Sequence, residues 1–394
     1  MPTPLVVPPR ESDILQTLRG VVDPELGADI VELGMVRDVT VGGQGDVRVT
    51  VALTISGCPL RTQIRDDVEH KVTGLPGVRT VKVEFGEMTP EQRTDVMQRA
   101  RKKAADNAPE TEVPLSTRII AVASGKGGVG RSSVTVNLAT ALALRGFTVG
   151  VLDADIWGFS VPRMLGVVGR LGGDDGKIRP YDVPIGPGHL KVVSMGLLVD
   201  DEDKAIMWRG LMLAKALEEF LVKVAWDEMD YLLLDMPPGT GDIQMALGRL
   251  LPRSEMIVVT TPALAAQRVA VRVADMARRS YLKVLGVIEN MSTFTCDHGE
   301  SYALFGEGGG QALAEELGAP LIGQVPLEPA LSAANDAGTP LALMTPDSVA
   351  GAAFAAIAGR IADELLPPVD MSGCSARLLA AVEERLGAPK PAVL

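Results

Sequence analysis

The sequence has few cysteines, no excess of positive charge and no long apolar run. Three cysteines, Cys58, Cys296 and Cys374, are spread over 394 residues, which favours free thiols or metal ligands over a disulfide framework. The net charge of −12 at pH 7 argues against broad binding to nucleic acid or anionic membranes. Neither a membrane span nor a signal-peptide segment can be recognised. We therefore expect a cytoplasmic protein without nucleic-acid or membrane partners.

Internal repeats and low-complexity tracts are also missing, and 46% hydrophobic with 22% charged residues is a globular composition. We predict a small α+β domain over residues 8–88, a helix and linker over 89–114, an α/β domain over 115–368 and a tail over 369–394. The small domain should run α-β-β-α-β, with helices over 11–22 and 59–75 and strands over 46–55 and 78–85. Gly42-Gly43 indicates a hairpin turn before the strand at 46–55. In the tail, residues 376–386 have a helical pattern.

The α/β domain is predicted from apolar strands that alternate with helical stretches. The strand segments are RIIAVAS, FTVGVLD, LKVVSM, YLLLD, MIVVTT, KVLGVIEN and PLIGQV. Most are continuous apolar runs, which is typical of parallel strands covered on both faces. The pattern predicts a doubly wound, mostly parallel sheet.

The stretch SGKGGVGRSS, residues 124–133, has the pattern of a phosphate-binding loop between a strand and a helix. Its candidate nucleotide-binding residues are Gly125, Lys126, Gly127, Gly128, Val129, Gly130, Arg131, Ser132 and Ser133. The glycines let backbone N–H groups turn toward phosphate oxygens, and the helix N-terminus favours an anion. Ser132 stands where a hydroxyl binds Mg²⁺. Arg131 replaces the usual lysine, so we expect binding to be retained and hydrolysis to be slow.

Acidic residues end two of the predicted strands. Asp153 and Asp155 follow FTVGVL, and Asp235 ends YLLLD before MPPGTGD. Ligands of α/β sheets bind beyond the carboxyl ends of the strands, which is where these carboxylates would lie. An acid at such a position can hold Mg²⁺ through water. Together with the glycine loop they predict a nucleotide and Mg²⁺ site.

These motifs, with VLDADIWGFSVPRMLG, MWRG, IENMSTF and FGEGGG, resemble the Mrp/ApbC family of P-loop ATPases of the deviant Walker A group, which carry and deliver iron–sulfur clusters. The resemblance covers roughly residues 117–366. The segments DPELGADIVELGMVRDV and LTISGCPLRTQI resemble the PaaD/MIP18-like iron–sulfur assembly domain. The resemblance implies an ATP-hydrolysing factor that transfers clusters to apoproteins, with iron–sulfur assembly proteins and apoprotein clients as partners.

The resemblance also assigns roles within the loop and the acids. It implies a homodimer in which Lys126 reaches the partner subunit's nucleotide. Asp155 would orient the attacking water, and Asp153 and Asp235 would support Mg²⁺. Asn290, in IENM, matches the residue that reads the adenine edge.

In the family a C-x-x-C pair from each subunit holds a bridging cluster, for which we expect the 4Fe–4S type. Here Cys296 matches the first ligand, whereas Gly299 stands at the second position. His298 and Cys374 are alternative sources of a ligand. Cys58 precedes Pro59 at a predicted helix start, where a thiol becomes more acidic, and it is a second candidate iron–sulfur ligand.

Two other functions remain open at this point. A positioning ATPase of the ParA/MinD type shares the early lysine, although the acidic balance and the additional N-terminal domain speak against it. An assembly scaffold that uses ATP without a cluster of its own is consistent with Gly299.

Overall fold

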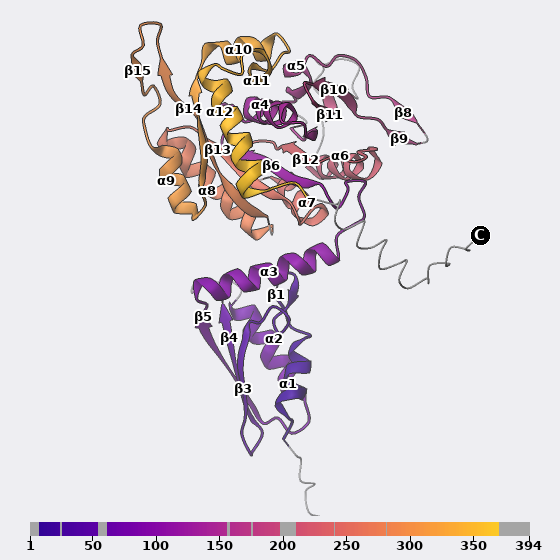
Figure 1. Ribbon diagram of the computed structural model, residues 1–394. Helices are drawn as coiled ribbons and strands as arrows, with labels where there is room; N and C mark the ends of the chain where they lie inside the picture. Colours follow the sequence, from indigo (N-terminus) through magenta and orange to yellow (C-terminus); the bar gives the residue numbers. More distant parts are fainter. Residues whose placement is uncertain are drawn as a thin grey trace, which may run out of the picture. The chain divides into compact units, whose positions relative to one another are not determined.

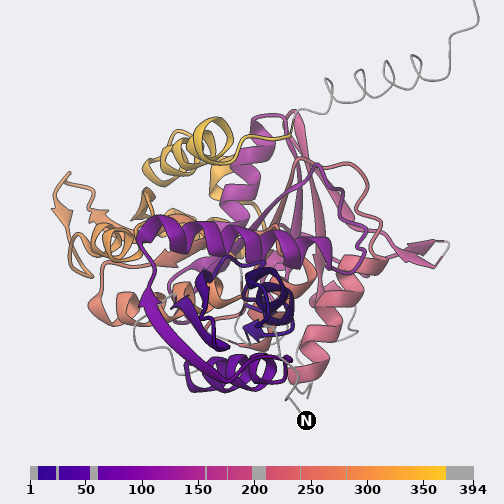
Figure 2. The same ribbon diagram turned by 90° about the horizontal axis from the view of Figure 1, so that it is seen from below.

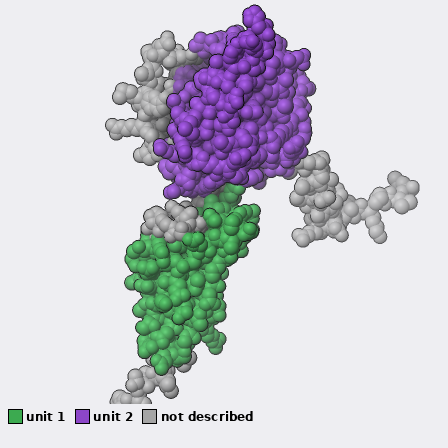
Figure 3. Space-filling view, turned by 90° about the vertical axis from the view of Figure 1, so that its left-hand side faces the viewer, with its two compact units in different colours: residues 1–108 green, residues 109–394 purple. Residues whose placement is uncertain are grey.

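The computed structural model describes residues 8–23, 26–53, 61–155, 158–174, 176–197, 210–239, 241–280 and 282–369. The chain divides into two compact units, residues 1–108 and 109–394, which have different colours in Figure 3. Within the described residues no helix is long and apolar enough to cross a membrane. The predicted tail helix at 376–386 lies outside the described residues.

The first unit is a small α+β fold. Its elements are α1 (Glu11–Leu18), β1 (Val22–Asp23), β2 (Ala28–Asp29), β3 (Val36–Val41), β4 (Asp46–Leu53), α2 (Arg61–Thr73), β5 (Thr80–Glu87) and α3 (Pro90–Asp106). Strand β4 lies between antiparallel β3 and parallel β5. The predicted α-β-β-α-β order is confirmed, with β1 and β2 added as a short antiparallel pair.

One boundary in this unit was predicted wrongly. The helix expected over residues 11–22 ends at Leu18, because the backbone turns at Gly20 and Val22 then pairs with Asp29. The apolar residues at this point are spaced as in a helix, but the β-branched Val22 is paired in a strand instead.

Helix α3 is one continuous helix attached to the first unit (Figures 1 and 2). It begins with a capping box in which Thr89 accepts from the backbone N–H of Gln92 and Gln92 accepts from that of Thr89. Further along, Lys103 forms an ion pair with Glu32, and Arg99 donates to the Glu32 carbonyl at 3.4 Å. Arg99 and Lys103 therefore contribute contacts within this unit.

In the part of the chain that the structure describes, the second unit is a nine-stranded sheet between two helical layers (Figure 1). Its strands are β6 (Arg118–Ser124), β7 (Thr148–Asp153), β10 (Tyr181–Ile185), β11 (Gly188–Ser194), β12 (Tyr231–Asp235), β13 (Glu255–Thr260), β14 (Lys283–Thr295), β15 (Ser301–Tyr302) and β16 (Leu321–Leu327). A separate short hairpin joins β8 (Gly173–Asp174) and β9 (Lys177–Ile178). The sheet order is β10-β11-β7-β12-β6-β13-β14-β15, with β16 on β14. Among the described residues, the antiparallel pairs within this nine-stranded sheet are β10–β11 and β14–β15, and its other pairs are parallel, so the predicted fold class is confirmed.

Helices cover both faces of this sheet. They are α4 (Arg131–Leu144), α5 (Val161–Met164), α6 (Gly210–Lys223), α7 (Asp242–Leu250), α8 (Leu264–Arg279), α9 (Gly309–Leu317), α10 (Pro329–Asp336), α11 (Leu341–Met344) and α12 (Val349–Arg360), with a 3-10 turn at Met195–Leu197 and a π-helical turn at Ile361–Leu365. Residues of β6 alternate between the layers: Ile120 and Val122 face the core that contains α4 and α12, and Ile119 and Ala121 face the core that contains α6 to α9. Because both faces are buried, the strand reads as a continuous apolar run.

Parallel order places the carboxyl ends of β6, β7 and β12 side by side. Asp235 pairs in register with Asp153 on one side and with Val122 on the other. The loop after β6 and the acids that end β7 and β12 therefore meet at one edge of the sheet.

Candidate functional site

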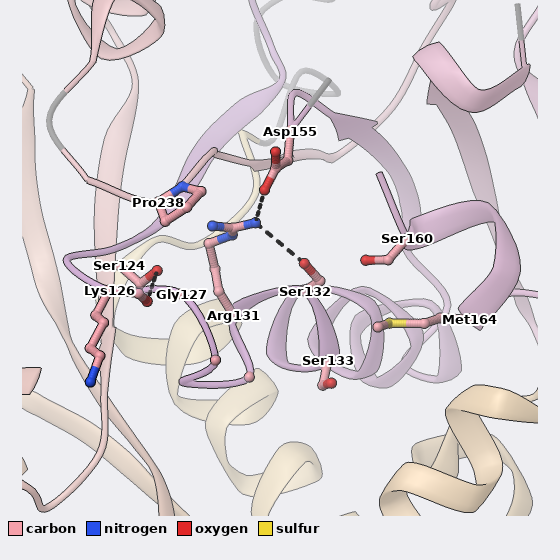
Figure 4. A pocket seen from close by; sticks show the side chains of 12 residues that line it. Ser124, Lys126, Gly127, Arg131, Ser132, Ser133, Asp155, Ser160, Met164 and Pro238 are labelled. Carbon is pink, nitrogen blue, oxygen red and sulfur yellow. Dashed lines mark hydrogen bonds and ion pairs between the residues drawn. The ribbon is translucent and has the colours of Figure 1, made fainter. Parts of the chain in front are cut away.

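A cavity of about 230 Å³ lies beside the loop between β6 and α4 (Figure 4). It is lined by Ser124, Lys126, Gly127, Gly128, Gly130, Arg131, Ser132, Ser133, Asp155, Ser160, Met164 and Pro238. Pockets for complete small ligands usually measure about 300–1,000 Å³. The cavity is smaller than that range.

The glycines of the loop serve different physical needs. A Cβ on Gly125 would lie 2.4 Å from the backbone carbon of Val269, so this glycine lets the loop pack against α8. Gly128 and Gly130 adopt left-handed backbone with φ of +83° and +78°, which other residues adopt at a cost. Gly127 has open space around it. The loop shape thus depends on packing as well as on backbone freedom.

Arg131, the first residue of α4, forms two ion pairs with the acids. Its Nε contacts Oδ1 of Asp235 at 2.7 Å, and its terminal nitrogen contacts Oδ2 of Asp155 at 2.8 Å. Figure 4 shows the side chain reaching toward Asp155. Burial alone would lower the pKa of Arg131, but the charges of Asp235 and Asp155 outweigh it and raise the pKa. The guanidinium therefore stays charged.

Asp235 is fully buried and is held by neighbours from α4. Ser132 Oγ donates to Asp235 Oδ2 at 2.5 Å, and Thr135 Oγ1 lies 3.2 Å from Oδ1. Burial raises the pKa of Asp235, whereas Arg131 and the Ser132 hydrogen bond oppose that rise. Because the contact with Arg131 is short and charge-assisted, we assign the carboxylate as ionised.

Asp153 organises the loop that carries Asp155. Its Oδ1 accepts from the backbone N–H of Asp155 at 3.1 Å, and its Oδ2 accepts from those of Ser160 and Val161 at 3.1 and 3.2 Å. Burial, then the charge of Asp235, raises the pKa of Asp153 to about 8. Asp153 lies behind the cavity lining and acts on the site through the backbone.

Lys126 is exposed on the rim of the cavity. In Figure 4 its side chain extends away from Arg131 and Asp155. Of the two basic residues of the loop, only Arg131 is directed at the acids.

Asn290 lies in β14 against the loop. It is 2% exposed, and its Nδ2 donates to the Val129 carbonyl at 2.9 Å. Its Oδ1 is buried without a hydrogen-bond partner in the described part of the chain. A Cβ on Gly130 would lie 2.2 Å from Asn290 Nδ2, so the amide and the loop are closely packed. Asn290 is not part of the cavity lining.

Cys296 lies in the turn between β14 and β15, away from the cavity lining. Its backbone N–H donates to the Glu300 carbonyl, and the Gly299 N–H donates to the Cys296 carbonyl, both at 2.9 Å. Gly299 has φ +81°. The Cys296 thiol is free and partly exposed. Cys58 and Cys374 lie outside the described residues, and among those described no group of three or more His, Cys, Asp or Glu side chains could hold a metal ion.

Sequence reasoning missed several residues of this site. Ser160, Met164 and Pro238 line the cavity, and all three occur within the two quoted acidic motifs, where a broader interpretation would have included them. Asn335, in α10, donates from Nδ2 to Ser133 Oγ at 3.0 Å. Nothing in the sequence points to Asn335, because it is 202 residues away from Ser133 along the chain.

Comparisons with known proteins give consistent matches for both units. A family model described as "NUBPL iron-transfer P-loop NTPase" matches residues 116–362, and one described as "Iron-sulfur cluster assembly protein" matches residues 11–85. The iron-sulfur cluster carrier protein of Mycobacterium tuberculosis is 44% identical over 364 residues, which is 89% of this chain and 93% of the relative. That of Synechocystis sp. is 42% identical, covering 89% and 97%. A solved nucleotide-binding protein from Archaeoglobus fulgidus in complex with ADP is 35% identical over 60% of this chain and 90% of its own, with a TM-score of 0.47.

Proposed function

We propose that this chain, which belongs to the NUBPL family of iron-transfer P-loop NTPases, is an ATPase that carries iron–sulfur clusters and delivers them to apoproteins. The observation that carries the proposal is the cavity lined by the glycine loop, Arg131 and Asp155, with Asp235 bonded to Arg131 behind it. The first unit, with its match to an iron–sulfur assembly domain, supports the same role. So do the long matches to relatives named iron–sulfur cluster carrier proteins.

The loop is proposed to hold the phosphates of ATP. Backbone N–H groups from Gly125 to Gly130 would surround phosphate oxygens at the N-terminus of α4. Arg131 would contact the β- and γ-phosphates, and Ser132 and Ser133 lie beside it on the cavity wall. Asn290 holds the loop at Val129, and the family resemblance is our ground for assigning it to the adenine edge.

The acidic edge suits Mg²⁺. Ser132 and Asp235 offer a hydroxyl and a carboxylate oxygen, and oxygen donors are what Mg²⁺ prefers; Asp153 would support the ion from behind. Ser132 and Asp235 are already in contact, and Asp153 fixes the loop that follows β7. When bound, Mg²⁺ neutralises charge that develops on the transferred phosphoryl group. Asp155, on the cavity wall, would orient the attacking water.

Lys126 supports a homodimer as the active form. Its exposed side chain points away from the acids of its own subunit. An ammonium on a flexible stem can reach phosphates of a nucleotide held by a second copy. ATP would then lie between two subunits, and hydrolysis would change how they fit together.

The cluster is the cargo in this proposal. A 4Fe–4S cluster takes four thiolates, and a dimer would supply two from its Cys296 residues. Thiols of a donor or client would supply the others, and Cys58 is a separate candidate ligand in the first unit. Free thiolates and a labile cluster suit a reducing compartment, and we propose the cytoplasm.

The test is anaerobic reconstitution of the full chain with iron and sulfide, followed by iron counts per dimer and transfer to an apo-ferredoxin with and without ATP. Three variants that each lack one cysteine are compared: Cys296→Ala, Cys58→Ala and Cys374→Ala. Loss of the cluster in Cys296→Ala would support carriage at the β14–β15 turn, and loss only in Cys58→Ala would move it to the first unit. If neither the wild type nor any variant holds a cluster while ATP is hydrolysed, the chain is an ATP-driven scaffold, which the glycine at position 299 also permits.

A further inference from the structure

The Arg131 guanidinium forms ion pairs with the two carboxylates that a site for metal and nucleotide would use. It contacts Asp235 at 2.7 Å and Asp155 at 2.8 Å, and the three side chains are 8%, 0% and 11% exposed. Solvent therefore screens these contacts weakly. Ser132 Oγ donates to the second oxygen of Asp235. Both oxygens of Asp235 are thus engaged by groups of the protein itself.

A lysine in the same place would have only one nitrogen with which to contact both carboxylates. Guanidinium presents several donors in a rigid plane, whereas an ammonium is a single point of charge on a flexible stem. Arg131 bonds Asp235 through Nε and Asp155 through a terminal nitrogen, so one side chain connects acids that follow two different strands. The departure from the usual lysine therefore changes which groups of the site are held together.

The place of Arg131 distinguishes it from a structural ion pair of the core. It begins α4 and lines the cavity together with Asp155. A buried ion pair contributes little net stability compared with apolar side chains of similar size. On a cavity wall, however, the same guanidinium can exchange a carboxylate for a phosphate, because both accept its forked donors.

We propose that Arg131 is an internal counter-ion that holds Asp155 and Asp235 before nucleotide binds and leaves them when phosphates offer it another anionic partner. The proposal rests on the proposed function in that this cavity takes nucleotide with Mg²⁺. A divalent ion and the guanidinium compete for the oxygens of Asp235, so the metal gains them only together with phosphate. The same exchange frees Asp155 to orient water, so the acid is available only when substrate is present.

Binding of Mn²⁺ to the nucleotide-free full chain tests this competition without turnover. The signal of free Mn²⁺ in electron paramagnetic resonance gives its affinity for the wild type, Arg131→Met and Arg131→Lys. We expect Arg131→Met to bind Mn²⁺ at least tenfold more tightly than the wild type, and Arg131→Lys to lie between them. Adding Asp235→Asn to Arg131→Met should remove the gain. Arg249→Met, which removes an equal charge from the exposed surface of α7, is the matched control and should behave as the wild type.

The outcomes separate this inference from the function on which it rests. Equal Mn²⁺ affinity in the wild type and both Arg131 variants, with all of them folded by circular dichroism, would overturn the counter-ion role even if ATP is hydrolysed. A gain in Arg249→Met as large as in Arg131→Met would overturn it as well, since bulk charge would then explain the effect. If the wild type binds no ATP, the proposed function fails, while the Mn²⁺ comparison still reports on Arg131. If Arg131→Met does not fold, Arg131→Lys takes its place. It should bind Mn²⁺ more tightly than the wild type, and adding Asp235→Asn should remove that gain.

Discussion

Replacing Gly299 with cysteine would restore the C-x-x-C spacing in the turn between β14 and β15. The loss of folding stability that this change causes follows from the backbone conformation at Gly299. Gly299 has φ +81°, where a residue with a Cβ is strained. A Cβ placed there has no atom within 4 Å, so the cost is conformational and not steric. Left-handed backbone costs a non-glycine residue about 1–2 kcal/mol. For a domain of this size that corresponds to a fall in Tm of roughly 2–8 °C.

The gain would be in cluster binding. In the proposed dimer, two Gly299→Cys turns that approach each other would offer four thiolates, which is the complete ligand set of a 4Fe–4S cluster. We expect more iron per dimer after anaerobic reconstitution than in the wild type, and slower loss of that iron to a chelator. Gly299→Ala is the matched control, because it has the same backbone strain without a thiol.

Two measurements decide the prediction. Thermal unfolding without iron should give the same Tm for Gly299→Ala and Gly299→Cys, both below the wild type. Iron and sulfide counts should rise only in Gly299→Cys. An unchanged iron count in a folded Gly299→Cys dimer would refute the idea that the two turns approach each other. A loss of stability well above about 2 kcal/mol in Gly299→Ala would refute the assignment of the cost to backbone conformation alone.

Further predictions concern packing, pH and the segment that leads into β6. Gly125→Ala should destabilise the second unit by about 3 kcal/mol or more in a denaturant titration, because its Cβ would meet the Val269 backbone at 2.4 Å, whereas Gly127→Ala should be tolerated. Burial raises the pKa of Asp153 to about 8. The folded state therefore binds the carboxyl proton of Asp153 more tightly than the unfolded chain does. The stability that this group contributes then falls as pH rises from about 4 to 8. Asp153→Asn should therefore show a smaller loss of Tm than the wild type between about pH 6 and pH 9, and an equal loss would contradict this origin. Arg253 donates to the carbonyls of Val113, Pro114 and Leu115 at 2.8–3.0 Å, so Arg253→Met should cost about 2–4 kcal/mol in unfolding experiments and expose residues 113–117 to protease.

The predicted elements of the second unit were confirmed because its strands are buried on both faces. A strand such as YLLLD can satisfy its apolar side chains only inside a sheet covered by two layers, so the local pattern decides the element. Where tertiary pairing competed with local pattern, the prediction was wrong. The helix expected over residues 11–22 ended at Leu18 because Val22 pairs with Asp29. Strand β14 continues to Thr295, beyond the predicted end at Asn290, because Thr295 pairs with Ser301.

The sequence by itself determined the glycine loop between β6 and α4 and the acids that end β7 and β12. Each of these depends on residues that are close together in the chain, such as a glycine run before a helix, or an acid after an apolar strand. Only the tertiary structure decided that Arg131 is paired with Asp155 and Asp235, which lie 24 and 104 residues away along the chain. The physical reason is that side chains from separate strands come within hydrogen-bond distance only when the sheet order brings their carboxyl ends together. No local pattern encodes that order.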